Sequence, residues 1–396
     1  MNKKKESKVV PNVRFKGFTD DWNQRKFEQI SDSYSGGTPT AGKKEYYDGD
    51  IPFIRSGEIS GDKTELFITE EGIKNSSAKL VTEGDILYAL YGATSGEVSI
   101  SKMKGAINQA ILAIQPHNGY DSQFIMQWLR KSKERIISTY LQGGQGNLSG
   151  NIVKELMIDL PTYDEQKQIG GYFEKIDTLI TLHQRKIDKL KNLKKAMLEK
   201  MFPKKGTVSL EIRFNGFTNA WEQRKLGDVC EVTMGQSPDG STYSDEPSDY
   251  ILVQGNADLK DGWVVPRVWT SQKTKTAQAG DLIMSVRAPV GAMGKTAYDI
   301  VIGRGVAAIK GNEFIYQTLV KYDADGYWKK LAAGSTFESV NSNEVKGAII
   351  NVPQDIEEQK KIGEYFLNLD HLITLHQRKL DMIKKLKSAC LSEMFI

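Results

Sequence analysis

The chain has 396 residues, a length that suggests two or three domains. Its 54 Lys and Arg residues exceed its 50 Asp and Glu residues by only 4, which excludes a polybasic, histone-like protein but not a local basic surface for nucleic acid. A hydrophobic content of 39% and a charged content of 26% are typical of a soluble globular protein, and Cys230 and Cys390 are too few for a disulfide framework, so we expect a reducing, cytoplasmic location.

Residues 1–160 are predicted to form a globular domain of mixed strands and helix. The basic N-terminus, MNKKKESK, lacks the apolar core of a signal peptide, and no later run reaches the roughly 18 apolar residues of a membrane helix. Short apolar runs at 86–90, 98–100 and 110–114 predict strands. Apolar residues at helical spacing predict a helix over 122–138.

A glycine-rich stretch at 35–59, SGGTPTAGKKEYYDGDIPFIRSGEI, is the first candidate DNA-binding segment. Basic and aromatic side chains interleaved on a loop suit contact with phosphates and with base edges. The candidates here are Lys43, Lys44, Tyr46, Tyr47 and Arg55. The alternative is that the charges are ordinary surface residues and the aromatic rings belong to the core.

Residues 161–205 predict a first long helix. Thr162 and Glu165 form a T-x-x-E capping signal after Pro161. Apolar residues then alternate spacings of four and three, which indicates a coiled-coil seam. The seam residues are Ile169, Phe173, Ile176, Ile180, His183, Ile187 and Leu190.

Residues 206–352 predict a second globular domain with the same mixture of elements. Strands are expected at 251–253, 281–286, 297–302 and 306–309, followed by a helix near 313–322. Arg287 and Arg304 follow or flank these strands and are further DNA-binding candidates.

Residues 353–396 predict a second long helix, which begins at the D-x-x-E signal of Asp355 and Glu358. Its seam repeats the first one. The seam residues are Ile362, Phe366, Leu369, Ile373, His376, Leu380 and Ile383.

The chain is a tandem duplication. VRFKGFTDDWNQRK at 13–26 returns as IRFNGFTNAWEQRK at 212–225, and the helix at 165–202 returns at 358–395 with LITLHQRK unchanged. The stretches between these blocks hardly match. Each half is therefore a divergent globular part followed by a nearly constant helix, which reflects either neutral drift or two versions of one task.

A helix of about 40 residues is roughly 60 Å long and must pack on something extended, most economically the other copy. A second apolar flank favours helices of a partner protein over packing on the globular parts. That flank comprises Tyr172, Leu179, Leu193, Tyr365, Leu372 and Leu386. His183 and His376 are predicted to fix the register of the pair rather than to bind a metal, because no cysteine or carboxylate cluster accompanies them. The HQRK segments make one face basic, for solvent, DNA phosphates or an acidic partner.

The sequence contains no recognisable catalytic set. GAMGKT at 291–296 resembles a nucleotide-binding loop, but Pro289 stands where the motif requires glycine. Asp355, Glu358 and Lys360 faintly resemble a nuclease set, yet they lie within one turn at a helix start. We therefore expect a recognition or scaffold protein.

Several strings in the right order resemble the specificity (S) subunit, HsdS, of type I restriction–modification systems. They are GGTP…YYDGDIPFI at 36–54, INQAILAIQP at 107–116, the P-x-x-x-EQKQI string at 161–169, SVRAPVG at 285–291, GRGVAAI at 303–309 and both HQRK helices. The resemblance covers essentially the whole chain.

The resemblance implies an α+β fold in which two target-recognition domains are separated by an antiparallel pair of long helices with pseudo-twofold symmetry. Each domain is expected to read one half of a split site in double-stranded DNA. Two methylase (M) subunits would dock on the chain, and restriction (R) subunits would join the full complex. S-adenosylmethionine, ATP and Mg²⁺ are expected on those partners, and neither a cofactor nor a metal on this non-catalytic chain.

Two other functions are open to test. A self-contained nuclease or methylase would show activity as the purified chain alone. A coiled-coil adaptor would leave the assembled complex unable to bind duplex DNA in a salt-dependent way.

Overall fold

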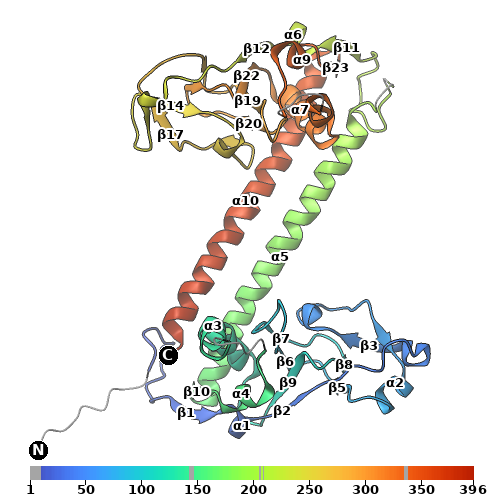
Figure 1. Cartoon of the computed structure of the whole chain (residues 1–396), viewed down its shortest axis with the longest axis vertical. Helices are drawn as coiled ribbons and strands as arrows, with labels where there is room; N and C mark the ends of the chain where they lie inside the picture. The colour runs from blue at the N-terminus through green and yellow to red at the C-terminus, as the bar shows by residue number, and fades with distance from the viewer. Residues whose placement is uncertain (1–9, 142–146, 205–206, 208, 334–337) are drawn as a thin grey trace, which may run out of the picture. The chain divides into compact units, whose positions relative to one another are not determined.

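The structure, a computed structural model, describes residues 10–141, 147–204, 207, 209–333 and 338–396. The chain divides into two compact units, and each is described by itself. The first unit comprises Met1–Leu182 with Lys379–Ile396, and the second comprises His183–Arg378. Figure 1 labels many of the helices and strands of both units.

The first unit contains short helices, one middle-sized helix and small sheets. Its helices are α1 (Phe27–Ile30), α2 (Glu70–Lys74), α3 (Ser122–Tyr140) and α4 (Gly150–Glu155), and α5 (Tyr163–Met201) begins in it. Its strands are β1 (Asn23–Lys26), β2 (Ser31–Ser35), β3 (Tyr47–Ile54), β4 (Phe67–Ile68), β5 (Lys79–Val81), β6 (Ile86–Ala89), β7 (Val98–Ile100), β8 (Gly105–Ile107), β9 (Ile111–Pro116) and β10 (Met157–Leu160).

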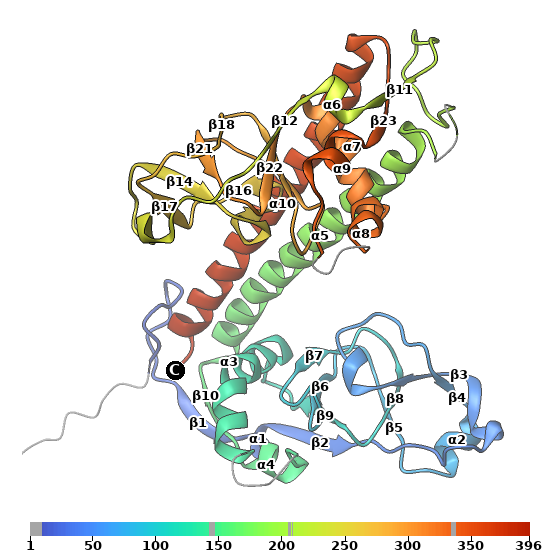
Figure 2. The ribbon, with the colours of Figure 1, turned by 45° about the horizontal axis from the view of Figure 1, so that its top comes forward.

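A central sheet separates the helices of this unit from a second sheet. The central strand order is β2-β9-β6-β7, and the outer order is β4-β3-β8-β5. Because side chains alternate across a strand, Ile86 and Tyr88 of β6 enter the core shared with α3, while Leu87 and Ala89 face the outer sheet. Figure 2 shows this order, from α3 through β6 and β9 to β3 and β5.

The second unit repeats this plan with more strands. Its strands are β11 (Glu222–Lys225), β12 (Glu231–Met234), β13 (Tyr243–Ser244), β14 (Tyr250–Val253), β15 (Leu259–Lys260), β16 (Trp263–Val264), β17 (Val268–Thr270), β18 (Thr276–Ala277), β19 (Leu282–Ser285), β20 (Met293–Lys295), β21 (Ile300–Ile302), β22 (Val306–Lys310) and β23 (Ile349–Val352). Its helices are α6 (Leu226–Val229), α7 (Glu313–Ala324), α8 (Tyr327–Ala332), α9 (Ser342–Lys346) and the first part of α10 (Ile356–Met394).

The layers of the second unit also match those of the first. The central order is β12-β22-β19-β20-β16-β15, and the outer order is β13-β17-β14-β21-β18. Leu282 and Met284 of β19 enter the core with α7, whereas Ile283 faces the outer sheet. The predicted α+β fold and its tandem repeat are confirmed.

Within each unit, segments of α5 and α10 pack antiparallel. In the first, Asp177 of α5 pairs with Lys387 of α10 at 2.6 Å, and the Phe173 and Phe395 rings lie 5.8 Å apart. In the second, Lys194 pairs with Asp370 at 2.7 Å. Asp177 corresponds to Asp370 in the repeat, and Lys387 to Lys194, so one ion pair is formed twice with the helices exchanged.

The carboxylates of the two predicted capping signals have a different role from the one expected. Glu165 and Glu358 are fully buried and do not cap their helices; each accepts two hydrogen bonds from an arginine, at 2.6 and 2.7 Å from Arg14 and at 2.7 and 2.8 Å from Arg213. Asp355 does cap, because its Oδ1 accepts from the Glu357 amide at 2.9 Å. The repeated VRF and IRF strings are thus the partners of the repeated helix starts.

Two local predictions from the sequence need correction. The glycine-rich stretch at 35–59 is not one loop, since Tyr47–Ile54 forms strand β3 inside it. Part of the predicted strand at 297–302 is loop, and only Ile300–Ile302 is strand. Strand β20 (Met293–Lys295) lies within the GAMGKT string, and Lys295 pairs with Glu313 at 2.9 Å, so the lysine of the string is engaged within the fold.

Candidate nucleic-acid interface

A basic hollow lies in the second unit, at one end of both sheets. Its volume is about 480 Å³. It is lined by Ser237, Pro238, Gly240, Tyr243, Gln254, Gly255, Asn256, Arg287, Ala288, Arg304 and Gly305. Among the described residues these lining positions include two arginines and no carboxylate, so the hollow suits an anionic or hydrogen-bond-accepting ligand.

Glycines allow three loops to meet beneath this hollow. A Cβ atom at Gly235 would lie 2.1 Å from the Gly303 carbonyl oxygen, and one at Gly305 would lie 2.0 Å from that of Gln254. The Gly303 amide donates to Val253 at 2.7 Å, and the Val286 amide donates to Gly305 at 2.9 Å. The floor is therefore a network of backbone hydrogen bonds from which side chains project at fixed positions.

The two arginines of this hollow were predicted from the sequence, and the structure brings them together. Arg287 and Arg304 are both exposed, and neither guanidinium forms an ion pair with any residue that the structure describes. The nearby Asp258 carboxylate is buried instead, accepting the Gln254 amide at 2.7 Å and pairing with Arg267 at 3.0 Å. Two guanidiniums are thus left available to a ligand.

The first unit has the same loop architecture. Gly36 permits the approach of the Ile107 carbonyl oxygen, which would lie 1.9 Å from a Cβ atom there. The Tyr47 hydroxyl donates to the Pro39 carbonyl at 2.7 Å, as the Tyr243 hydroxyl donates to Pro238 at 3.2 Å. The same loop geometry is thus present in both units, which indicates that the two sets of loops have the same kind of role.

The remaining predicted DNA-binding residues lie beside these loops in different states. Lys43 and Lys44 are exposed, and Lys43 lies 4.9 Å from the centre of the Tyr46 ring and donates to its hydroxyl at 3.1 Å. Tyr46 is only 7% exposed, so its ring belongs to the core. Tyr47 is half-buried.

Arg55 is engaged by acidic neighbours. Its guanidinium binds both carboxylate oxygens of Glu58, at 3.0 and 2.8 Å, and reaches Glu65 at 3.5 Å. The hydrogen bond from Arg55 lowers the pKa of Glu58 to about 2. Arg55 therefore stabilises its own loop and is less available to DNA than Arg287 or Arg304.

Sequence reasoning missed several side chains of these loops. Gln254 and Asn256 line the hollow, and Gln109 is exposed in the first unit with its Oε1 accepting from the Thr38 hydroxyl. A signal was present, since INQAI at 107–111 aligns with IGRGV at 302–306. An uncharged amide side chain is not recognisable as a binding candidate from the sequence alone; its position at the surface of the fold is needed.

Most predicted helix-interface residues are buried, though not all between helices. Ile169, Phe173 and Ile176 belong to the hydrophobic core of the first unit, and Ile362, Phe366 and Leu369 to that of the second. Ile187 and Leu380 are also buried. Ile180 and Ile373 are half-buried.

His183 and His376 face each other with their Nδ1 atoms 2.9 Å apart, within hydrogen-bond distance. Among the described residues no cluster of three or more His, Cys, Asp or Glu side chains is arranged for a metal.

The second apolar flank divides into two groups. Tyr172 and Tyr365 rest on their own units, against Phe15 at 5.8 Å and Phe214 at 6.4 Å. The leucines are between 43% and 55% exposed on each unit. Those of the predicted flank are Leu179 and Leu386 on the first unit, and the corresponding Leu372 and Leu193 on the second. Leu182 and its counterpart Leu375 were not part of the predicted flank and are similarly exposed. An identical exposed leucine set on each unit is suited to a partner protein that binds twice.

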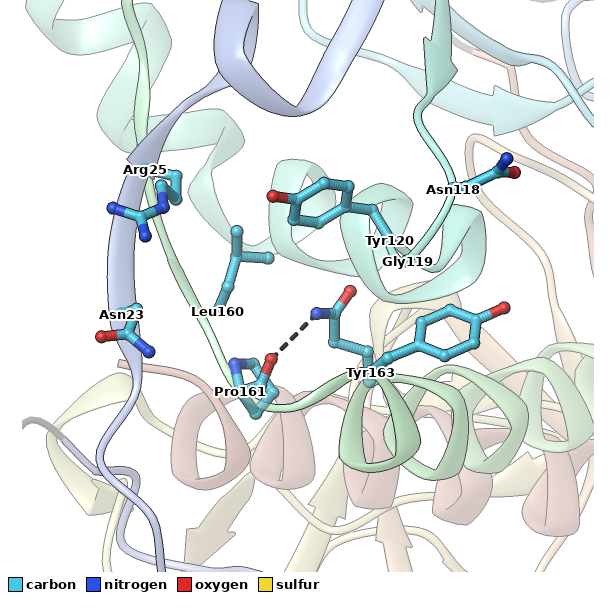
Figure 3. Close-up of a pocket in the computed structure, with 9 residues that line it drawn as sticks. Asn23, Arg25, Asn118, Gly119, Tyr120, Leu160, Pro161 and Tyr163 are labelled. Carbon is cyan, nitrogen blue, oxygen red and sulfur yellow. Dashed lines mark hydrogen bonds between the residues drawn. The ribbon is translucent and has the colours of Figure 1, made fainter.

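A smaller hollow of about 270 Å³ lies where α5 begins in the first unit. Figure 3 shows Asn23 and Arg25 of β1 along one side and Tyr120 and Tyr163 on the other. Gln166 is buried in its floor, donating to the Pro161 carbonyl at 2.9 Å and accepting the Asp121 amide at 3.1 Å. Since its buried amide is engaged, this junction holds the domain on the helix, and we assign it no ligand.

No helix in the part of the chain that the structure describes is long and apolar enough to cross a membrane.

Two known proteins resemble this chain, one over most of its length and the other over part of it. A protein of Methanocaldococcus jannaschii named as a putative type I restriction enzyme MjaX specificity subunit is 28% identical, covering 93% of this chain and 91% of that protein. The EcoR124I/EcoR124II specificity subunit of Escherichia coli is 29% identical over 38% of this chain and 40% of its own length.

A solved structure has the same fold. The crystal structure of a type I restriction–modification S subunit from M. genitalium superposes with a TM-score of 0.71 at 15% identity, covering 98% of this chain and 99% of that one. The model of the type I restriction modification DNA specificity domain matches residues 19–192 and again residues 219–385. The chain therefore belongs to the family of type I restriction–modification DNA specificity proteins, with the family's domain present twice.

Proposed function

We propose that this chain is the non-catalytic specificity subunit of a type I restriction–modification complex, in which each globular domain reads one half of a bipartite DNA site. One observation carries the proposal: two units of the same architecture present different side chains at corresponding loop positions. Such a pair of domains is what two unlike half-sites require, because a shared framework fixes the geometry and the side chains select the bases.

The contacts with DNA belong to these loops. Arg287 and Arg304 line the hollow of the second domain, and Lys43 and Lys44 are exposed beside the loops of the first. Each lysine or arginine that neutralises a phosphate releases a counterion, so each lost phosphate contact lowers the slope of log K against log salt by about one. We also propose that the first domain ends at residue 160, the first helical segment at residue 205 and the second domain at residue 352.

The exposed leucines of α5 and α10 support docking of two methylase subunits, one on each unit. In such a complex the chemistry belongs to the partners: methylase subunits hold S-adenosylmethionine, and restriction subunits use ATP and Mg²⁺. A cytoplasmic location suits a protein that binds chromosomal DNA. The reducing cytoplasm would also keep Cys230 and Cys390, which are free cysteines, in the thiol form.

A domain exchange tests the proposal. Residues 13–160 are replaced by the matching domain of a relative, and methylated adenines are mapped across the genome of the host. We expect one half-site to change while the other stays intact. A map in which both halves change, or neither does, would refute independent reading, and nuclease or methylase activity of the purified chain alone would establish an enzyme instead.

A further inference from the structure

The two sets of loops correspond position by position, which allows their side chains to be compared. Tyr91 and Arg287 each lie two residues beyond a central strand and each form an isolated bridge, to Asn147 and Ser339 respectively. Gln109 and Arg304 each lie two residues beyond an outer strand, β8 or β21.

The strand registers confirm these pairs. Ile54 pairs with Ile107 in the parallel β3–β8 ladder, and Val253 pairs with Ile302 in the parallel β14–β21 ladder. Ala89 pairs with Ile111, as Ser285 pairs with Val306. Tyr91 and Gln109 of the first domain therefore occupy the positions of Arg287 and Arg304 in the second.

In each domain one further arginine forms an ion pair with a loop carboxylate. These two arginines do not occupy corresponding positions in the repeat. Arg55 binds Glu58 in the first domain, and Arg267 binds Asp258 in the second. Once these are set aside, the two compared positions are neutral in the first domain and doubly cationic in the second. The difference lies in side chains that are free of ion pairs among the described residues, so it is available for recognition.

We infer that these two corresponding positions are specificity determinants of the two domains, and that the second half-site contains guanine read by Arg287 and Arg304. This inference rests on the proposed function. Guanine presents two acceptors, O6 and N7, in the major groove, and the planar fork of an arginine matches both. Gln109, whose amide is oriented by Thr38, offers instead the donor and acceptor that match adenine.

The test uses the full chain assembled with its methylase subunits, on duplexes taken from the map of methylated sites. Each guanine of the second half-site is replaced in turn by 7-deazaguanine, which lacks only the N7 acceptor. We expect at least one replacement to weaken binding roughly 10- to 150-fold, the range of one hydrogen bond to a charged group. A replacement that weakens binding of the wild type is expected to have no further effect in the complex that carries Arg287→Gln or Arg304→Gln, whichever variant removes the arginine reading that guanine.

Matched variants separate base reading from general electrostatics and from misfolding. Arg224→Gln, on the exposed strand β11, removes one positive charge outside the hollow and is expected to keep full sensitivity to 7-deazaguanine. If Arg287 and Arg304 contact only phosphates, their variants bind all duplexes more weakly, have a lower salt slope and remain sensitive to 7-deazaguanine. That result would overturn the inference, as would a second half-site without guanine.

A transfer experiment tests the correspondence itself. Tyr91→Arg combined with Gln109→Arg is expected to shift the first half-site toward guanine and to leave the second unchanged, with Gln24→Arg on β1 as the control. A first half-site unaltered in a complex of unchanged melting temperature would refute the correspondence. A wild-type complex without any sequence preference would overturn the proposed function, and this inference with it.

Discussion

Arg14, which is partly exposed, pairs with the buried carboxylate of Glu165 and ties the segment before β1 to the start of α5. The carboxylate is fully buried and its two hydrogen bonds come from one guanidinium, so Arg14→Ala would leave an uncompensated charge. We expect a loss of about 3–5 kcal/mol in the free energy of unfolding. Urea denaturation followed by circular dichroism measures it.

A double variant tests the physical reason for this loss. Removing both charges, as in Arg14→Leu with Glu165→Leu, is expected to cost less than Arg14→Ala alone, because no buried charge remains. Arg213 and Glu358 provide the same pair in the second unit. A double variant no more stable than the single one would show that shape, rather than charge, dominates at this junction.

Glu58 gives the first domain a pH-dependent contribution to stability. Arg55 lowers its pKa from the ordinary 4.5 to about 2, so the stabilisation is fully present above pH 4.5 and is lost as the pH falls through 2. The full shift would correspond to about 3 kcal/mol, and solvent screening of the half-exposed Arg55 reduces the expectation to about 1–2 kcal/mol.

The variant Glu58→Gln should therefore be less stable than the wild type at pH 7, with a difference that shrinks between pH 4.5 and 2. Urea titrations at several pH values measure that difference. A constant difference across this range would mean that the ion pair contributes nothing specific to the charged form.

At the scale of elements, the end of α10 completes the core of the first unit. The Phe395 ring lies 5.0 Å from that of Phe124 and 6.4 Å from that of Trp22, and it is 2% exposed. Phe395→Ala should cost about 3–5 kcal/mol through the cavity it leaves. Phe202, at the end of α5, stacks on Phe314 at 5.5 Å in the second unit, so Phe202→Ala is the matched variant.

Hydrogen exchange of the backbone amides shows which part of the chain each variant destabilises. Phe395→Ala is expected to weaken protection in α3, and Phe202→Ala in α7. Equal loss of protection in both helices from either variant would contradict the separate cores.

Substitution of the exposed leucines is expected to change partner binding rather than the free energy of unfolding. Leu182→Glu and Leu375→Glu add charge at side chains that already face solvent, so stability should change by no more than about 0.5 kcal/mol. Each is expected to abolish the binding of one methylase subunit, which native mass spectrometry of the assembled complex would count. Retention of both subunits by the double variant would show that docking uses another surface.

The long helices and the two arginines of the hollow were predictable here, and the arrangement of the loops around those arginines was not, for a physical reason. Apolar spacing along α5 and α10 is a local property, and the helices predicted over 161–205 and 353–396 are found at Tyr163–Met201 and Ile356–Met394, within four residues of the predicted bounds. The hollow around Arg287 and Arg304 instead depends on parallel pairing of β14 with β21, which brings Val253 beside Ile302 from 49 positions away. A local sequence pattern does not predict such a pairing between distant strands. Neutral lining residues such as Gln254 also lack the charge by which a binding residue is recognised in a sequence.

At the scale of the whole molecule, the duplication explains why each unit is built from both long helices. The first unit takes the beginning of α5 and the end of α10, and the second takes the rest of both. Corresponding contacts, Asp177 with Lys387 and Asp370 with Lys194, are therefore made by opposite partners. The repeat therefore uses one set of helix contacts twice, once within each unit, with the two helices exchanged.

If α5 and α10 set the spacing between half-sites, their length should set the non-specific gap. Four residues inserted after Leu182 and four after the corresponding Leu375 lengthen both helices by about 6 Å, or about two base pairs. On each helix the insertion point lies between the Asp177–Lys387 and Lys194–Asp370 pairs, so equal insertions in both helices leave each pair in register. A four-residue insertion is a stutter that coiled coils accommodate by local unwinding. We expect both half-sites to persist with a gap lengthened by one or two base pairs. Insertion in α5 alone puts Asp177 and Lys194 out of step with α10 and should disrupt one of the two ion pairs, because both can no longer be in register at once. Mapping of methylated adenines decides the matter, because an active complex with an unchanged gap would show that the helices are not the ruler.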